Sequence, residues 1–387
     1  MKFLKTIIIL LISQGVFAQI NVKKEFEFAA KQYEGMLASH PDITQFPQST
    51  NPDGSPRNMK SSWWCSGFFG GSLWYIYEST KDPKWKEAAE KWTMAVEKEQ
   101  YNTGTHDLGF MLYCPFGNGY RLTKNEKYKE IMLTGAKSLS TRFDPKVGLI
   151  KSWNKFQGKY EYPVIIDNMM NLEFLFWAAK ESGNKDFYNL SVTHADNTLK
   201  NHFRPDNSSY HVICYGPNGE VLAKKTHQGA ADESAWARGQ AWGLYGYIVM
   251  YRETKDPKYL EHAHKIAAFI LNNPNLPEDK IPYWDFSKPG EERDASAGAI
   301  TSSALFELSD YTKDSKLKKE YIASATKMLE SLASPAYKAK LGENNHFILM
   351  HSTGHKPGKS EVDVPLVYAD YYYLEALLRY QNLKSRK

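Results

Sequence analysis

The chain has 387 residues, of which 42% are hydrophobic and 24% are charged, and its formal net charge is +5. This composition is typical of a globular protein and excludes a disordered or collagen-like chain, and the absence of Lys and Arg blocks argues against a nucleic-acid-binding protein. Aromatic residues make up 14% of the chain, which suits either a large core or a carbohydrate cleft, because flat rings pack against the C–H faces of sugars.

Residues 1–18 have the pattern of a cleavable export signal. Lys2 and Lys5 precede an apolar stretch over residues 6–13, and Val16 and Ala18 are acceptable residues for cleavage after Ala18. No later apolar run is long enough to span a membrane. The three cysteines, at positions 65, 114 and 214, are too scattered for a disulfide framework or a metal site. We therefore expect a periplasmic or secreted protein with a single domain over residues 19–387.

A short turn recurs along the chain, each time between two helical patterns. Residues 80–85 (TKDPKW) and 254–259 (TKDPKY) are near copies of each other, and looser copies lie at 123–128, 183–187 and 312–317. In each copy Asp or Asn can cap the following helix, and Pro, where present, occupies its first position. Helices before the turns are apolar all round, as in 70–78, 168–179 and 241–251, whereas helices after them are amphipathic, as in 85–97 and 260–271.

This alternation predicts two nested rings of helices, with the apolar helices inside. Five helix pairs and a last inner helix over residues 368–380 predict an all-α fold, an (α/α)6 barrel. Residues 210–215 and 220–223, on either side of Pro217-Asn218-Gly219, predict a small β-hairpin insertion. An open helical solenoid is the alternative, but irregular insertions between the units favour a closed ring with its loops at one mouth.

In such a barrel, polar residues just before the inner helices or in their first turns are the candidate site residues. Residues 105–110 (THDLGF) place His106 and Asp107 among apolar neighbours, and Asp167 lies between an Ile pair and a Met pair. A carboxylate in an apolar stretch is costly unless it is paired or functional, and helix capping is the structural alternative for both acids. If a helix begins at Asp167, Asn171 shares its face. Apolar surroundings would raise the pKa of Asp167, and a helix N-terminus would lower it.

Two further segments carry candidate residues. In residues 234–245 a helical stripe would join Ser234, Arg238, Trp242 and Tyr245, and Arg beside Trp could clamp a carboxylate. An Arg packed on core aromatics is the alternative. Residues 62–71 supply aromatic and small residues at a helix start, which alone indicate a core more than a site. No HExxH motif, phosphate-binding loop or nucleophile elbow is present, and nothing in the sequence indicates a cofactor or a metal.

Together these segments resemble the unsaturated glucuronyl hydrolases of glycoside hydrolase family 88. The matching segments are residues 64–69 (WCSGFF), 106–110 (HDLGF), 166–172 (IDNMMNL), 236–242 (WARGQAW), 282–286 (PYWDF), 294–297 (DASA) and 368–372 (YADYY). They run in order over almost the whole chain after residue 60. The resemblance implies an (α/α)6 barrel that acts after polysaccharide lyases and removes a 4,5-unsaturated uronic acid without a metal or nucleotide.

The resemblance also implies roles for individual residues. Asp167 would be the general acid/base that protonates C4, after which water adds at C5 and the hemiketal opens and expels the remaining sugar. Asp107 would be the second carboxylate, which holds the substrate and tunes Asp167. The subsite for the unsaturated sugar would be lined by Trp64, His106, His211, Gln228, Arg238 and Trp242. The loop over residues 351–360 resembles the segment of the family that faces the next sugar. Our hypothesis is that Lys356, Lys359 and the hydroxyl groups of this loop read a sulfate there; a solvated charge-rich loop is the alternative. The expected partner is an anionic unsaturated oligosaccharide, and the expected state is a monomer or a weak homo-oligomer.

Three other activities fit parts of the sequence. Unsaturated rhamnogalacturonyl hydrolases share the barrel and the chemistry but act on pectin fragments; the His106-Asp107 pair and residues 236–242 favour the glucuronyl branch. An inverting endoglycanase on this barrel would need a long open cleft and typically a Glu as its acid. A non-catalytic exported glycan-binding protein would explain the aromatic residues but not two acids within apolar segments. The sequence leaves the parent polysaccharide open among chondroitin, hyaluronan, heparin-type chains and a bacterial gum.

Overall fold

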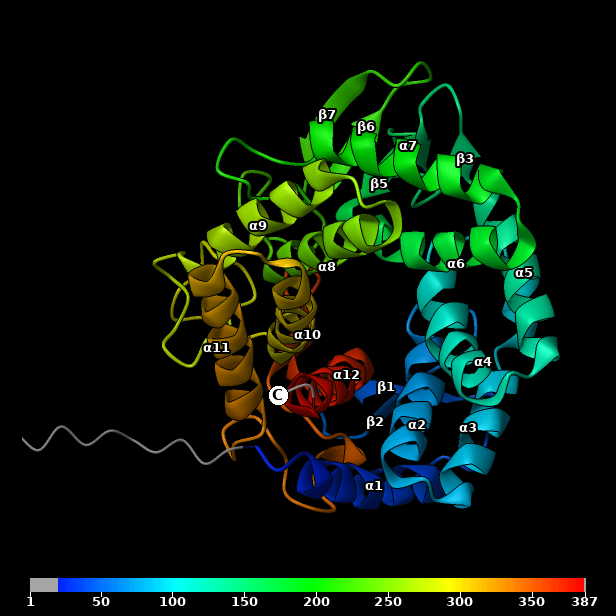
Figure 1. Ribbon diagram of the computed structural model, residues 1–387, viewed down its shortest axis with the longest axis vertical. Coiled ribbons are helices and arrows are strands. Elements are labelled where there is room, and N and C mark those ends of the chain that lie inside the picture. Colours follow the sequence, from blue (N-terminus) through cyan, green and yellow to red (C-terminus); the bar gives the residue numbers. More distant parts are fainter. Residues whose placement is uncertain (1–19, 386–387) are drawn as a thin grey trace, which may run out of the picture.

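The computed structural model describes residues 20–385, and these residues form a closed double ring of helices (Figure 1). The predicted (α/α)6 barrel is therefore confirmed. The export signal expected over residues 1–18 lies outside the described residues. Within residues 20–385, no helix is both long enough and apolar enough to cross a membrane.

The inner ring consists of helices that are buried almost all round. Its members are α2 (Ser66–Thr80), a π-helix (Gly109–Gly117) continued by α4 (Asn118–Thr123), α6 (Leu172–Ser182), α8 (Ala237–Thr254), α10 (Ala295–Tyr311) and α12 (Val367–Ser385). In α8 every residue from Ala237 to Met250 is buried, and in α10 every residue from Ala295 to Phe306. Such helices can only be stable between two layers of neighbours, which explains why their sequences show no polar face.

The outer ring consists of amphipathic helices. Its members are α1 (Val22–Ser39), α3 (Pro83–Met94), α5 (Glu126–Ser140), α7 (Lys185–Asn201), α9 (Pro257–Leu271) and α11 (Ser315–Leu332). The predicted caps are confirmed from α3 onward, because a side-chain oxygen of the Asp or Asn in each recurring turn accepts a backbone N–H of the helix that follows.

Helix α1 was not among the predicted pairs, and it supplies the sixth outer helix. It is joined to the C-terminal part of the chain, where Glu25 is bound by Lys338 at 2.7 Å and by the Tyr373 hydroxyl at 2.8 Å. Gln32 Nε2 donates to the Phe347 carbonyl at 2.9 Å. The first and last parts of the described chain therefore close the ring together.

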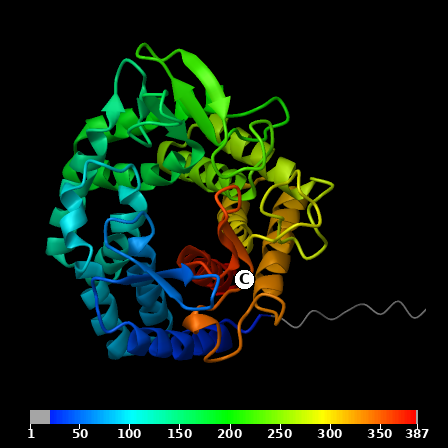
Figure 2. The ribbon, with the colours of Figure 1, turned by 180° about the vertical axis from the view of Figure 1, so that it is seen from behind.

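Short strands gather where the inner helices begin. The predicted hairpin is confirmed as β6 (Val212–Tyr215) and β7 (Val221–Lys225), and β5 (Tyr162–Ile165) adds a third antiparallel strand to it. Two hairpins that were not predicted cover the same end of the barrel (Figure 2): β1 (Phe46–Thr50) with β2 (Pro56–Met59), and β8 (Ser352–His355) with β9 (Ser360–Val364). A short pair, β3 (Phe143–Asp144) with β4 (Leu149–Ile150), completes the strands.

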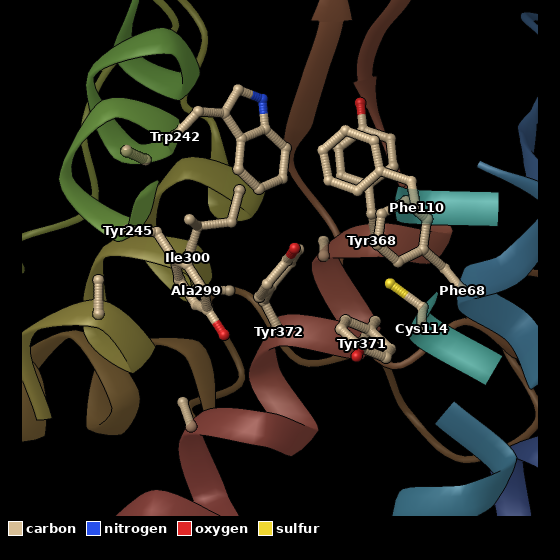
Figure 3. Close-up of a cluster of buried hydrophobic side chains, with 14 of the residues drawn as sticks. Phe68, Phe110, Cys114, Trp242, Tyr245, Ala299, Ile300, Tyr368, Tyr371 and Tyr372 are labelled. Atoms are coloured by element: carbon tan, nitrogen blue, oxygen red, sulfur yellow. The ribbon is translucent and has the colours of Figure 1, made fainter. Parts of the chain in front are cut away.

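Aromatic rings from the inner helices fill the barrel axis (Figure 3). The Phe110 ring lies 5.3 Å from Phe68 and 5.2 Å from Trp242, and the Trp242 ring lies 5.3 Å from Tyr372. These tilted and edge-on contacts are favourable ring geometries. Much of the aromatic surplus of the sequence therefore forms a buried core, and among residues 20–385 the exposed rings are those of Trp63, Tyr101 and Tyr188.

Candidate active site

A cavity of about 250 Å³ opens at the end of the barrel where the inner helices begin. Six of the residues singled out in the sequence lie on its wall: Trp64, His106, Asp107, Asp167, Gln228 and Arg238. They come from positions far apart in the chain, because successive inner helices bring their first turns to the same mouth. The fold thus brings residues from distant segments of the chain together in one site.

Asp167 is the buried acid of this cavity. Strand β5 leads into a 3-10 helix, Ile166–Asn171, and this turn places the Asp167 side chain on the wall with 8% of the residue exposed. Burial raises the pKa of Asp167 to about 7, and the Arg238 charge lowers it less than burial raises it, while Asp107 raises it further. Within the described residues Asp167 Oδ2 has no hydrogen-bond partner. A carboxyl with these properties can hold and release a proton near neutral pH.

The predicted pairing of Asp167 with Asn171 on one helical face is wrong. The segment is a 3-10 helix, in which positions three apart are aligned, and not an α-helix. Asn171 instead accepts the backbone N–H of Gly109 at 2.9 Å. Neither acid caps a helix through its side chain: the π-helix after Asp107, the 3-10 helix that contains Asp167 and helix α6 after it all begin without a side-chain cap bond. Helix capping is therefore excluded as the role of these two acids.

His211 lies behind Asp167 and not on the cavity wall. Its Nδ1 accepts the backbone N–H groups of His227 at 3.2 Å and of Gln228 at 3.1 Å. Because Nδ1 accepts, the hydrogen of the neutral ring is on Nε2, which lies 3.7 Å from Asp167 Oδ2. Burial lowers the pKa of His211 well below its ordinary value, so the ring is neutral. His211 thus turns a neutral N–H toward the acid.

Asp107 is the second carboxylate on the wall. The Thr105 hydroxyl donates to its Oδ2 at 2.8 Å, and His106 Nε2 lies 3.3 Å from its Oδ1. The His106 ring is 1% exposed, its Nδ1 is 2.9 Å from Asn168 Oδ1, and burial lowers its pKa. Asp107 is therefore held by the Thr105 hydroxyl at the edge of the cavity, with the His106 ring beside it and 15% of its side chain exposed.

Arg238 was expected to clamp a substrate carboxylate, but its guanidinium is engaged within the protein. It donates to Asp294 Oδ2 at 3.0 Å and to the carbonyls of Thr353 and Gly354 at 2.6 and 2.7 Å. It also lies 4.5 Å over the Trp236 ring. Arg238 thus ties helix α8 to hairpin β8–β9, and its positive charge still acts on Asp167 through space.

The predicted stripe from Ser234 to Tyr245 is only partly correct. Helix α8 begins at Ala237, so Ser234 lies before it and its hydroxyl donates to Asp285 at 2.7 Å. Trp242 is fully buried in the aromatic core and does not reach the cavity wall; its indole N–H is among the groups that lower the pKa of Asp167.

Gln228 and Lys356 have contrasting positions. Gln228 lies on the wall, and its Nε2 donates to the Gly354 carbonyl at 2.9 Å. Lys356 does not line the cavity, and its ammonium group is bound by Glu291 at 2.7 Å and by Glu292. It is therefore not the free cation that reading a sulfate would require.

Several wall residues were not predicted as site residues: Arg57, Trp63, Trp153, His227, His355 and Glu361. Three of them lie inside segments that the sequence did single out, since Trp63 precedes Trp64, His227 precedes Gln228, and His355 belongs to the loop over residues 351–360. Arg57 and Glu361 come from two different hairpins, and no motif marks them.

A second cavity of about 440 Å³ opens at the opposite end of the barrel. It is larger, but its charged groups bind one another: Glu375 accepts the hydroxyls of Tyr75 and Tyr245 at 3.1 and 3.0 Å, and Arg121 binds Glu78. Among the described residues that line it, no buried side-chain nitrogen or oxygen lacks a hydrogen-bond partner. The smaller cavity, with the unpartnered Asp167 oxygen, is therefore the candidate active site.

The comparisons with known proteins agree on one family. Residues 39–375 match the model of Glycosyl Hydrolase Family 88. The chain is 46% identical over 376 residues to the unsaturated glucuronyl hydrolase of Formosa agariphila, covering 93% of this chain and 92% of that protein. The structure of an unsaturated glucuronyl hydrolase specific for heparin is similar with a TM-score of 0.91 and 49% identity, over 94% of this chain and 98% of that one. A relative in complex with dGlcA-Glc-Rha-Glc has a TM-score of 0.87 and 29% identity, over 92% and 96% of the two chains.

Proposed function

Because the chain belongs to glycosyl hydrolase family 88 and is therefore a glycoside hydrolase, we propose that it removes 4,5-unsaturated glucuronic acid from the non-reducing end of lyase-generated oligosaccharides. The observation that carries this proposal is the Asp167 carboxyl, which is buried on the cavity wall, has a pKa raised to about 7 and keeps one oxygen without a partner. A cavity of about 250 Å³ suits one or two sugar rings and not a long polysaccharide.

The proposed reaction adds water to the double bond. Protonated Asp167 gives its proton to C4 of the unsaturated sugar, and the ring oxygen stabilises the cation that forms at C5. Water adds at C5 and returns a proton to Asp167. The hemiketal then opens by breaking the bond between C5 and the ring oxygen, and C1 becomes an aldehyde as the remaining sugar leaves. The anomeric carbon is never attacked, so the rule that links carboxylate spacing to retention or inversion does not apply.

The decisive assay follows the ultraviolet absorbance of the conjugated double bond. The protein is mixed with unsaturated disaccharides released by lyases from heparin, chondroitin and hyaluronan, and loss of absorbance is expected with at least one of them. The fastest substrate identifies the parent polysaccharide, and the heparin-specific relative makes the heparin disaccharides the first to test. A flat trace with every glucuronyl substrate would contradict the proposal. Turnover of unsaturated pectin fragments alone would favour the rhamnogalacturonyl branch.

The activity is expected to fall as the pH rises through about 7. Asp167 must carry its proton in the free enzyme, and its pKa is about 7, so kcat/KM should drop about tenfold per pH unit on the alkaline side. A profile that stays flat well above pH 7 would contradict the assignment of Asp167 as the acid.

The raised pKa of Asp167 also makes the stability of the protein depend on pH. Because the folded-state pKa of Asp167 is raised above the ordinary 3.8, its contribution to stability is fully present below about pH 4 and is lost as the pH rises through about 7. Asp167→Asn lacks this dependence. Thermal unfolding at about pH 5 and about pH 8 should therefore show Asp167→Asn gaining stability over wild type at the higher pH.

Trp63→Ala is expected to raise KM by about 2- to 10-fold and to leave kcat unchanged. This factor in KM corresponds to the loss of one stacking contact of about 0.5–1.5 kcal/mol. Trp63 is 38% exposed at the cavity rim, where it can contact the outer sugar but not the reacting atoms. Tyr101→Ala is the matched control, because Tyr101 is 70% exposed and lies away from the cavity. Steady-state kinetics measure KM and kcat of both variants. An equal change in KM for Trp63→Ala and Tyr101→Ala would show that Trp63 does not contact the substrate.

We further propose that residues 1–18 direct export to the periplasm or the medium and that the mature protein acts as a monomer or a weak homo-oligomer. Amino-terminal sequencing of the exported protein should begin at Gln19, and light scattering over a range of concentrations should report the assembly state. A cytoplasmic protein that keeps Met1 would contradict the export proposal.

A further inference from the structure

Among the residues that the structure describes, the permanent cations on the cavity wall are Arg57 and Arg238. Arg238 is 1% exposed and already donates to Asp294 and to two backbone carbonyls. The lysines of the loop over residues 351–360, Lys356 and Lys359, are not on this wall. Arg57 is therefore the cation that a ligand in the cavity can reach.

Arg57 lies in strand β2, and its side chain is 30% exposed. Its Nη1 donates to the Ser360 hydroxyl at 3.0 Å, which is its one hydrogen bond within residues 20–385. Its Nε lies 4.0 Å from Glu361 Oε1, which is too far for a hydrogen bond. Because a guanidinium has five N–H donors in a fixed fork, most of those of Arg57 remain available to a ligand.

Two hairpins fix the position of Arg57. Strand β1 is bulged at Gln48, whose Nε2 donates to Glu361 Oε1 in β9. Ser49 pairs with Arg57 across the β1–β2 hairpin, and its hydroxyl donates to the Pro365 carbonyl at 2.8 Å. Hairpin β1–β2 is thus tied to β8–β9 beside the cavity. Arg57 is presented from a paired strand, so little side-chain and backbone freedom has to be lost when it binds a ligand.

Which part of the substrate Arg57 meets follows from the proposed function. The carboxylate of the unsaturated sugar is attached to C5, next to the C4 that Asp167 protonates, so it lies beside Asp167. Besides burial, the charges that shift the pKa of Asp167 are those of Arg238 and Asp107. Burial raises the pKa of Glu361, and it is this carboxyl on which the Arg57 charge acts, lowering its pKa. An anionic group at Arg57 therefore belongs to the second sugar.

We propose that Arg57 binds a sulfate group on the second sugar and so selects sulfated disaccharides. The planar guanidinium can donate two parallel N–H bonds to two oxygens of one sulfate, which a neutral hydroxyl group cannot match. Glu361 acts as a competitor, because its carboxylate compensates part of the Arg57 charge when the site is empty. This inference rests on the proposed function and adds the substrate class that the cavity prefers.

The test compares pairs of unsaturated disaccharides that differ only by one sulfate on the second sugar, with each sulfate position represented. The measured quantity is the ratio of kcat/KM for the sulfated member to that for the unsulfated member, so that each pair contains its own reference. In wild type this ratio should exceed one for at least one position. In Arg57→Gln the same ratio should fall by about 10- to 100-fold, the usual effect of losing hydrogen bonds to a charged group.

Three further variants show how the sulfate is bound. Arg57→Lys keeps the charge but not the planar fork, so its ratio should lie between those of wild type and Arg57→Gln. Glu361→Gln removes the competing charge and should raise the ratio, whereas a merely structural link between the hairpins would lower kcat/KM for both members alike. Arg121→Gln is the matched control and should leave the ratio unchanged. The Arg121 side chain is 48% exposed and donates to Glu78 at 2.7 Å, at the other end of the barrel.

Calorimetric binding of the same pairs to Asp167→Asn separates this proposal from the proposed function. Tighter binding of the sulfated member, lost when Arg57→Gln is added, would support sulfate recognition even in a protein that turns over neither member. The proposal is overturned if neither binding nor turnover favours the sulfated member of any pair, or if such a preference survives in Arg57→Gln. A preference that is lost instead in Lys359→Gln would assign the sulfate to the loop over residues 351–360 and would also overturn it.

Discussion

Replacing Asp167 with Asn is expected to lower kcat by about 10²- to 10⁴-fold, the usual contribution of one general acid/base. Asn has almost the same shape but cannot give a proton to C4, so binding of the unsaturated disaccharide should be retained. The measurement is the loss of double-bond absorbance under saturating substrate, together with calorimetric binding to the same variant. Turnover within tenfold of wild type would assign the acid elsewhere.

Asp370 provides a matched control for this experiment. It is also fully buried, burial also raises its pKa to about 7, and it lies in the first turn of α12, away from the cavity wall. Its carboxylate accepts the backbone N–H groups of Ile348 and Leu349 at 2.8 and 2.9 Å. Asp370→Asn should therefore cost stability but keep kcat. If both variants lost turnover equally while folded, the loss in Asp167→Asn would not be specific to the acid.

Arg238→Met is expected to lower the free energy of unfolding by about 3–5 kcal/mol, the usual cost of removing one partner of a buried ion pair. The substitution leaves Asp294, which is fully buried, without its cation and frees the carbonyls of Thr353 and Gly354. Hairpin β8–β9 loses its attachment to α8, so KM should rise as well. Urea unfolding measures the stability, and steady-state kinetics measure KM.

A double variant separates this role from direct substrate binding. Asp294→Asn keeps an oxygen that can cap α10 but removes the negative charge, so adding it to Arg238→Met should cost less than the sum of the two single changes. If Arg238 served mainly to bind the substrate carboxylate, Arg238→Met would raise KM while leaving the free energy of unfolding within about 1 kcal/mol of wild type.

The ring of helices was predictable because its signals are local. Asp82 and Asp256 cap the helices that follow them, and Pro83 and Pro257 occupy the first helical positions, so turn and helix can be recognised from six consecutive residues. Helix α1 was missed because no such turn precedes it. Hairpin β8–β9 was missed for a different reason: its position depends on Arg238, more than 100 residues earlier in the chain.

The site was predictable where a residue conflicts with its surroundings. Asp107 and Asp167 stand out because a carboxylate in an apolar segment needs an explanation. Arg238 lies on the cavity wall, but its guanidinium also binds two backbone carbonyls, which carry no sequence signal. The pKa of Asp167 depended on opposing effects of burial, Arg238 and Asp107, and only the folded arrangement shows that burial prevails.

The closure of the ring by its first and last helices determines how early the barrel can fold during synthesis. Helix α12 packs against both α2 and α10, and α1 is joined to segments near the C-terminus. Helix α12 covers apolar faces of α2 and α10. Until α12 has left the ribosome, these faces remain open to solvent and the barrel cannot close. We therefore expect the barrel to close only after α12 has left the ribosome, and the exposed apolar faces to need protection from aggregation until then.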